Sequence, residues 1–242
     1  MVSAGFKTDR GRRRNNNEDS LFVLPGHGIY MVADGVGGNN SGEVASRTAV
    51  SYVAAYVERH PLSEVSDEEQ LKKYFMSCIT ETNEQVYRLA SLDCENAGMA
   101  TTLVVAYVKE GRGYVVNVGD SRAYLVRGDQ ILQITRDHTY VNELFMQGSI
   151  SAEEAKHHPE RNMITRAIGG EKTVRPDFFR FDLFSGDVIV LCTDGLFGEL
   201  EDGQICQAVQ LQGSMRELAG DLVAQANEHG GKDNISVICI RI

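Results

Sequence analysis

The sequence has no tryptophan, only four prolines and five cysteines among 242 residues. The cysteine count is odd and no two cysteines are spaced C-x-x-C, which argues against a disulfide framework and a zinc knuckle. No stretch approaches the ~18–20 apolar residues that span a bilayer, and the first residues do not resemble a secretory signal. We therefore expect a cytoplasmic protein without a membrane anchor. Cys192 and Cys239 lie inside apolar runs, so we expect both thiols to be buried.

Basic residues are also scarce relative to acidic ones: 24 Lys and Arg stand against 34 Asp and Glu, which gives a formal net charge of −10. Such an acidic chain repels phosphate backbones, which disfavours nucleic-acid binding. The only dense basic run, residues 10–14, is consistent with a solvated N-terminal arm. Nothing in the composition marks a domain boundary, so residues 1–242 are predicted to form a single domain. We expect a monomer, since no amphipathic stripe is left over after core packing.

Hydrophobic periodicity predicts a mixture of strands and helices. Helices are predicted at 42–60, 67–92, 202–210 and 215–229, with short helical pieces at 141–147 and 152–157. Strands are predicted at 20–24, 28–33, 101–108, 114–118, 123–126, 130–134, 178–183, 187–192 and 234–242. Asn40 can cap the first helix, with Glu43 as its capping-box partner. Because the two kinds of element do not alternate strictly, the pattern predicts an α+β fold with antiparallel sheets and helices packed outside them.

The most informative residues are four aspartates at or near the ends of apolar strands, namely Asp34, Asp120, Asp194 and Asp233. An unpaired carboxylate at the rim of a core is costly, and several together can be stabilised by divalent cations such as Mg²⁺ or Mn²⁺. The alternative for each is an ordinary aspartate in a turn. No histidine pair has the H-E-x-x-H spacing of a zinc protease.

Short motifs are spread over nearly the whole chain. They are Arg14-Asn15-Asn16-Asn17-Glu18-Asp19-Ser20, Val32-Ala33-Asp34-Gly35-Val36-Gly37-Gly38, Ala100-Thr101-Thr102-Leu103, Gly119-Asp120-Ser121-Arg122, Asp137-His138-Thr139, His158-Pro159-Glu160-Arg161-Asn162, Thr165-Arg166-Ala167-Ile168-Gly169, Thr193-Asp194-Gly195-Leu196 and Lys232-Asp233-Asn234. Each motif alone is weak, but the ordered set is specific. It resembles the PPM/PP2C-type metal-dependent protein phosphatases, and in particular their compact bacterial stand-alone members.

This resemblance implies an α-β-β-α sandwich, in which two central antiparallel sheets are flanked by helices on both faces. It also implies a cleft at one end of the sandwich that holds two Mn²⁺ or Mg²⁺ ions. Asp34 is then shared by both ions, Asp194 and Asp233 complete the shell of the first, and the Gly35 carbonyl ligates the second. A water or hydroxide that bridges the two ions attacks phosphorus directly, without a covalent enzyme intermediate.

Further roles follow from the same resemblance. Glu18 and Asp19 hold metal-bound waters, and Arg14 binds the phosphate through its guanidinium fork. Asp120 is a ligand of a third, weaker ion, with an ordinary turn aspartate as the alternative. Residues 137–167 match the mobile flap beside the cleft.

Two positions leave open questions. His158 is either catalytic or a residue that positions the flap. Asn39 stands where many bacterial members carry a histidine, so either another group serves as the general acid or this position lies outside the chemistry.

The function implied is hydrolysis of phosphoserine and phosphothreonine on proteins. The expected partners are phosphorylated proteins, in a pathway that opposes a Hanks-type Ser/Thr kinase or controls type VI secretion. There are two alternatives: a catalytically silent, metal-stabilised domain that senses phosphorylated partners, which is a different class of function, and a related phosphatase that serves an anti-sigma-factor switch. The presence of Arg14, Asp34, Asp194 and Asp233 argues against the silent domain, and the chain has no room for the sensor domain typical of the switch.

Overall fold

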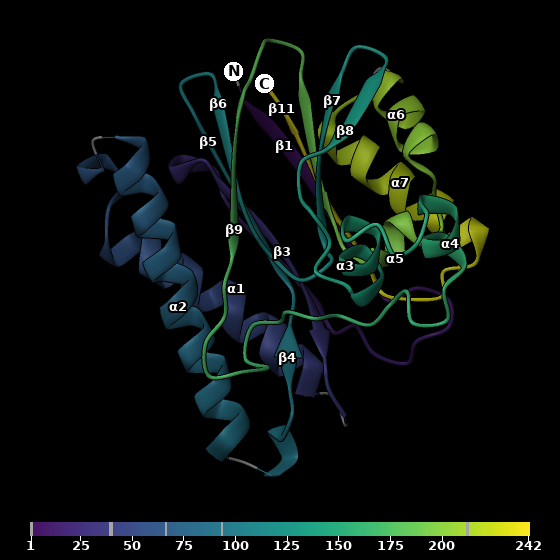
Figure 1. Ribbon diagram of the computed structural model, residues 1–242. Coiled ribbons are helices and arrows are strands. Elements are labelled where there is room, and N and C mark those ends of the chain that lie inside the picture. The colour runs from purple at the N-terminus through teal and green to yellow at the C-terminus, as the bar shows by residue number, and fades with distance from the viewer. Residues whose placement is uncertain (1, 39–40, 66, 93, 212) are drawn as a thin grey trace.

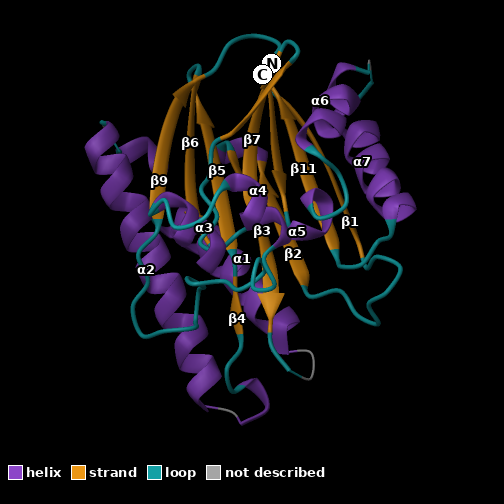
Figure 2. Ribbon diagram, turned by 45° about the vertical axis from the view of Figure 1, so that its right-hand side comes forward, coloured by secondary structure: helices purple, strands orange, loops and turns teal. Residues whose placement is uncertain are grey.

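The structure is a computed structural model that describes residues 2–38, 41–65, 67–92, 94–211 and 213–242. Two antiparallel sheets lie face to face, and helices cover the outer face of each (Figures 1 and 2). This confirms the α-β-β-α sandwich that the resemblance implied.

The first sheet joins the two ends of the chain and has the strand order β1-β11-β10-β7-β8. The second has the order β2-β3-β5-β6-β9, and the short strand β4 pairs with β3. The first sheet contains β1 (Ser3–Asp9), β7 (Arg122–Arg127), β8 (Gln130–Gln133), β10 (Val188–Cys192) and β11 (Ile235–Arg241). The second contains β2 (Asp19–Leu24), β3 (Ile29–Val36), β4 (Ala100–Thr101), β5 (Leu103–Lys109), β6 (Arg112–Val118) and β9 (Asp177–Asp182).

Helices α1 (Ser41–Arg59) and α2 (Glu68–Leu92) pack on the second sheet, and α6 (Asp202–Gln210) and α7 (Met215–His229) pack on the first. Between β8 and β9 the chain forms α3 (Tyr140–Met146) and α4 (Ala152–His157), and α5 (Asp194–Phe197) directly follows β10. Short 3₁₀ turns occur at Pro25–His27, Leu62–Glu64 and Cys94–Asn96. Within the described ranges, no helix combines the length and apolar character needed to cross a membrane.

Three apolar clusters hold these layers together, one under each helix pair and one between the sheets. Strand β10 is buried along its whole length because a sheet covers one of its faces and helices cover the other. Its sequence is therefore a continuous apolar run instead of an alternating one. Cys192 and Cys239 are fully buried free thiols, as predicted.

Sequence periodicity identified most of these helices and strands but did not separate β4 from β5, which it predicted as one strand at 101–108, and it missed two elements altogether. Strand β1 lies at the edge of its sheet and is largely exposed, so it carries little of the alternation that signals a strand. Helix α5 has only four residues. The basic run 10–14 is not an arm but the connection between β1 and β2, tied down by hydrogen bonds from the Arg12 and Arg13 amides to the Gly231 carbonyl (2.8 and 3.2 Å). The capping residue predicted at Asn40 lies outside the described residues.

The topology brings several chain segments to one end of the sandwich. Strand β2 begins there, β3 and β10 end there, and β11 begins there, because neighbouring strands run antiparallel. Asp19 faces Asp34 directly in the β2–β3 register, so their side chains share one face of the sheet.

Candidate metal and phosphate site

Five aspartates gather at this end of the sandwich. Asp19 starts β2, Asp34 lies near the end of β3, and Asp120 is in the turn between β6 and β7. Asp194 is the first residue of α5, and Asp233 lies just before β11. The charge of each of the other four raises the pKa of Asp34. The four strand-end aspartates singled out from the sequence are therefore brought together with Asp19 in one electrostatic cluster.

The backbone of Asp34 is held rigidly by two threonines. Its amide donates to Thr102 Oγ1 at 2.8 Å, and its carbonyl accepts from the Thr101 hydroxyl and the Thr102 amide, both at 2.8 Å. Thr102 Oγ1 also lies 2.7 Å from Ser121 Oγ, next to Asp120. Hydrogen bonds from the neighbouring chain segment therefore fix the backbone from which the Asp34 side chain extends toward the cluster.

Two carboxylate oxygens in the cluster are buried without a hydrogen-bond partner. Asp19 accepts from Thr193 Oγ1 at 2.8 Å through Oδ2, but its Oδ1 has no partner. Asp194 Oδ1 is likewise buried and unpartnered. Proteins rarely leave buried polar atoms unsatisfied, and a bound cation would satisfy both oxygens. The donor set is all oxygen, which suits Mg²⁺ and Mn²⁺.

Burial and mutual repulsion make this group of carboxylates expensive to ionise. Burial, followed by the charges of neighbouring aspartates, raises the pKa of Asp120 to about 7. Burial also raises the pKa of Asp19 to about 7, with hydrogen bonds opposing it. The pKa of Asp34 is raised well above its usual value, by burial first and by Asp19 next. Divalent cations would offset this concentration of negative charge, so the residues present fit such ions.

Arg14 is the one cationic side chain that forms an ion pair with an aspartate of the cluster in the part of the chain that the structure describes. Its Nη2 lies 2.7 Å from Asp233 Oδ2, and this hydrogen bond raises the pKa of the guanidinium. Within the described ranges, no group of three aspartate, glutamate, histidine or cysteine side chains is arranged to hold a metal ion. Asp233, one of the predicted ligands, is paired with Arg14.

Gly35 and Glu18 lie beside Asp34 in tightly packed backbone. A Cβ on Gly35 would approach the Gly42 carbonyl oxygen to 2.0 Å, so only glycine fits there. The Glu18 carbonyl accepts from the Gly35 amide at 3.2 Å and from Ser46 Oγ at 2.6 Å. The backbone around the predicted second metal is thus fixed from several elements.

A cleft of about 1000 Å³ opens beside the cluster, and Asp120, Asp194 and Asp233 line it. Its other side is formed by the segment that carries α3 and α4, which lies next to α5 in both views (Figures 1 and 2). This segment belongs to the stretch predicted to be the flap. Arg122 Nη2 pairs with Asp137 Oδ2 at 2.7 Å and so ties the start of the flap to β7.

The two positions left open by the sequence differ in outcome. His158 does not line the cleft. Its Nδ1 accepts from the Glu160 amide at 3.1 Å and its ring packs edge-on against Tyr140, which favours the flap-positioning role. Asn39 lies outside the described residues, so its role stays a prediction.

Three residues that support the site were not singled out from the sequence. Thr102 holds Asp34 and Thr193 holds Asp19. The Asn234 side chain accepts from the Glu18 amide at 2.8 Å and donates to the Asn16 carbonyl at 2.8 Å, which fastens the first motif to the last. All three stand inside the motifs named above, and Thr193 and Asn234 are direct chain neighbours of Asp194 and Asp233.

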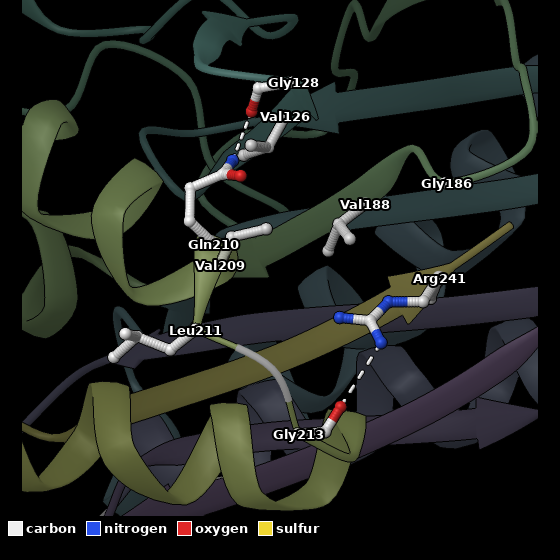
Figure 3. Close-up of a pocket in the computed structure, with 9 residues that line it drawn as sticks. All are labelled: Val126, Gly128, Gly186, Val188, Val209, Gln210, Leu211, Gly213 and Arg241. Carbon is white, nitrogen blue, oxygen red and sulfur yellow. Dashed lines mark hydrogen bonds between the residues drawn. The ribbon is translucent and has the colours of Figure 1, made fainter.

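Figure 3 shows a second cavity, of about 580 Å³, lined by Val126, Val188 and Arg241 among others. It lies at the opposite ends of β7, β10 and β11 from the aspartates. The Arg241 guanidinium donates to the Gly213 carbonyl at 3.2 Å. None of the predicted site residues lines this cavity.

Comparisons with known proteins agree with this geometry. The family model for protein phosphatase 2C matches residues 8–235. A serine/threonine phosphatase, stp, of Listeria innocua is 36% identical over 243 residues, which cover 99% of this chain and 95% of that protein. The catalytic domain of the serine/threonine protein phosphatase PstP, solved in complex with two manganese ions, superposes with a TM-score of 0.86 at 31% identity and covers 99% of this chain and 97% of that one. PppA of Pseudomonas aeruginosa, described as a key regulatory component of the type VI secretion system, superposes with a TM-score of 0.85 at 27% identity and covers 99% and 97%.

The carboxylate cluster predicts an unusual pH dependence of stability in the presence of a chelator. A carboxyl whose folded pKa is raised stabilises the fold below its unfolded pKa, and this contribution is lost as the pH rises through the folded pKa. Asp19 and Asp120 have folded pKa values of about 7, against about 4 when unfolded. Between about pH 4 and pH 7 the melting temperature in EDTA should therefore fall more steeply for the wild type than for Asp19→Asn.

Thermal unfolding followed by circular dichroism measures this effect, and the Asp19→Asn comparison cancels the contributions of other titrating groups. Added Mn²⁺ should raise the melting temperature more at about pH 8 than at about pH 5, since ligands must lose their protons to bind. Parallel pH profiles for the two proteins, together with no effect of Mn²⁺, would contradict the site.

Proposed function

The chain belongs to the protein phosphatase 2C family, and on this premise we propose how its residues carry out the family's reaction. It is a metal-dependent protein serine/threonine phosphatase that uses Mn²⁺ or Mg²⁺. We propose that it hydrolyses phosphoserine and phosphothreonine by direct attack of water, without a covalent enzyme intermediate. The observation that carries this proposal is the pair of buried, unpartnered carboxylate oxygens of Asp19 and Asp194 within a cluster of repelling aspartates.

We propose that Asp34, Asp194 and Asp233 would hold the first of two ions and that Asp34 would also hold the second. The Gly35 carbonyl would contribute to the second site, and Asp120 would hold a third, weaker ion. When bound, the ions supply positive charge that lowers the pKa of water toward neutrality and offsets charge on the phosphoryl oxygens. What supports the assignment is that Asp120, Asp194 and Asp233 line one cleft, while Thr101 and Thr102 lock the backbone of Asp34 beside it.

Glu18 and Asp19 are proposed to orient water at the site through their carboxylates. Asp19 is already held in one orientation, because Thr193 Oγ1 donates to its Oδ2 and leaves Oδ1 free to accept. Glu18 accepts from Asn16 Nδ2 at 2.9 Å through Oε1. Both carboxylates can therefore accept a hydrogen bond from the O–H of a water molecule in a fixed direction.

Arg14 is proposed to bind the phosphoryl group of the substrate. Its side chain is half exposed beside the cluster and its guanidinium interacts electrostatically with Asp34 and Asp194. A guanidinium fork matches two phosphoryl oxygens and also offsets the charge that builds up on them in the transition state.

The cellular setting remains a proposal. A phosphatase for phosphoserine and phosphothreonine requires a kinase that makes them, so we propose phosphorylated proteins as substrates and a Hanks-type Ser/Thr kinase as the opposing enzyme. The likeness to PppA supports control of type VI secretion as one such setting. We also propose that the enzyme is a monomer with a single domain, and that it is cytoplasmic, which its free cysteines support.

The proposed metal ligands predict a loss of turnover without a loss of fold. Asp34→Asn should reduce Mn²⁺-dependent hydrolysis of p-nitrophenyl phosphate and of a phosphothreonine peptide by more than about 100-fold, since even changes behind a ligand cost ~10–100-fold at metal sites. In EDTA the same variant should melt no earlier than the wild type, because it removes a carboxyl group that burial and the neighbouring aspartates make costly to ionise. Exposed Asp129 provides the matched control: Asp129→Asn should leave the rate unchanged. Near wild-type turnover by Asp34→Asn would remove Asp34 from the mechanism.

The proposed phosphate contact predicts a different signature. Arg14→Ala, assayed at saturating Mn²⁺, should raise KM for the phosphopeptide, because the side chain holds the phosphoryl group in both the ground and the transition state. Steady-state kinetics of Arg14→Ala beside Arg13→Ala, whose side chain is also exposed, measures this. A KM that is the same in all three proteins would rule out phosphate binding by Arg14.

A further inference from the structure

We propose that Arg14 and a metal ion compete for the same carboxylate oxygen of Asp233, so that metal loading releases Arg14 to bind phosphate. This rests on the proposed function, in which Asp233 is a metal ligand and Arg14 binds the substrate. It adds that the two tasks are coupled through one oxygen atom. The enzyme would then bind metal and phosphosubstrate cooperatively.

The contact itself is short and specific. Arg14 Nη2 lies 2.7 Å from Asp233 Oδ2, the length of a charge-assisted hydrogen bond. The other carboxylate oxygen, Oδ1, accepts from the Asn234 amide at 2.8 Å. A metal ion that uses Oδ2 would meet a guanidinium already on that atom, and two cations on one oxygen repel each other.

The backbone keeps Arg14 within reach of Asp233. The Arg12 and Arg13 amides both donate to the Gly231 carbonyl, at 2.8 and 3.2 Å, so the loop that carries Arg14 is fastened to the loop that carries Asp233. The Arg14 side chain is nevertheless 52% exposed and is free to turn. It can therefore exchange Asp233 for a phosphate without any rearrangement of the fold.

Lys232, the cationic residue before Asp233 in the chain, pairs with a different carboxylate, that of Glu199. Lys232 stands next to Asp233 in the chain, but its Nζ lies 3.3 Å from Glu199 Oε2, and the Glu199 side chain is only 5% exposed. The Lys232 amide also donates to Glu199 Oε1 at 3.2 Å. Lys232 is thus drawn to Glu199, while Arg14 is the cation that pairs with Asp233.

Coupling of this kind is reciprocal. If a metal ion weakens the Arg14–Asp233 pair, then removal of Arg14 must strengthen metal binding by the same free energy. The ion pair is partly exposed, and such pairs change an equilibrium by roughly two- to fivefold. That change is large enough to measure directly and needs no substrate.

The test is titration of the 242-residue chain with MnCl₂ alone, in which the electron paramagnetic resonance signal of free Mn²⁺ reports the dissociation constant. Arg14→Ala should bind Mn²⁺ roughly two- to fivefold more tightly than the wild type. Arg13→Ala removes the same charge from the same loop without touching Asp233, so it should show a much smaller change. Arg14→Lys keeps a cation near Asp233 and should stay close to the wild type.

A double-mutant cycle separates the effect of the direct Arg14–Asp233 contact on Mn²⁺ binding from the long-range electrostatic effect of the Arg14 charge. In the Asp233→Asn background, Arg14→Ala should no longer tighten Mn²⁺ binding, because the shared oxygen has lost its charge. An equal gain in both backgrounds, or no gain in either, would overturn the competition while leaving the phosphatase mechanism intact. Failure of the wild type to bind Mn²⁺ at all would overturn the proposed function and the competition together.

Discussion

Repulsion among carboxylates that the fold holds together at one end of the sandwich is the constraint on which the rest of this molecule depends. Asp19 and Asp34 face each other across two paired strands, and burial raises the pKa of both. A fold selected for stability alone would not place them there, since each ionised carboxylate disfavours the next. Proteins tolerate such local conflicts mainly at functional sites, where a ligand removes the conflict.

The sandwich can tolerate this cost because the cluster is carried by its most rigid parts. Strands β10 and β11 are buried almost throughout, and hydrogen bonds from Thr102 and Thr193 fix the neighbouring aspartates. The segment with α3 and α4 on the other side of the cleft has no apolar cluster of its own comparable to those under the long helices. We infer that the strand ends carrying the aspartates are rigid and that the segment with α3 and α4 has a lower local stability. Segments of low local stability are the ones that move around active sites. We therefore expect the segment with α3 and α4 to determine substrate choice.

Sequence reasoning recovered the layers of the fold better than the details of the site. The apolar face of α2 carries a strong periodic signal, β10 and β11 stand out as continuous apolar runs, and the predicted ends of α6 and α7 agree with the structure. Strand β1 gave no signal because an exposed edge strand buries little. Periodicity also cannot show that residues as far apart as Asp34 and Asp233 meet, because convergence depends on how strands from both halves of the chain pair. For that step the ordered motifs and the family they resemble were needed, and even they did not indicate the contact between Arg14 and Asp233 or the clamp made by Asn234.

Anomalous X-ray diffraction from crystals soaked in Mn²⁺ tests the central claim most directly, because it locates the ions independently of turnover. The account predicts a pair of anomalous peaks that share Asp34, with Asp194 and Asp233 turned toward one of them. Crystals that show no manganese at these aspartates, or carboxylates that point away from one another at saturating Mn²⁺, would contradict it.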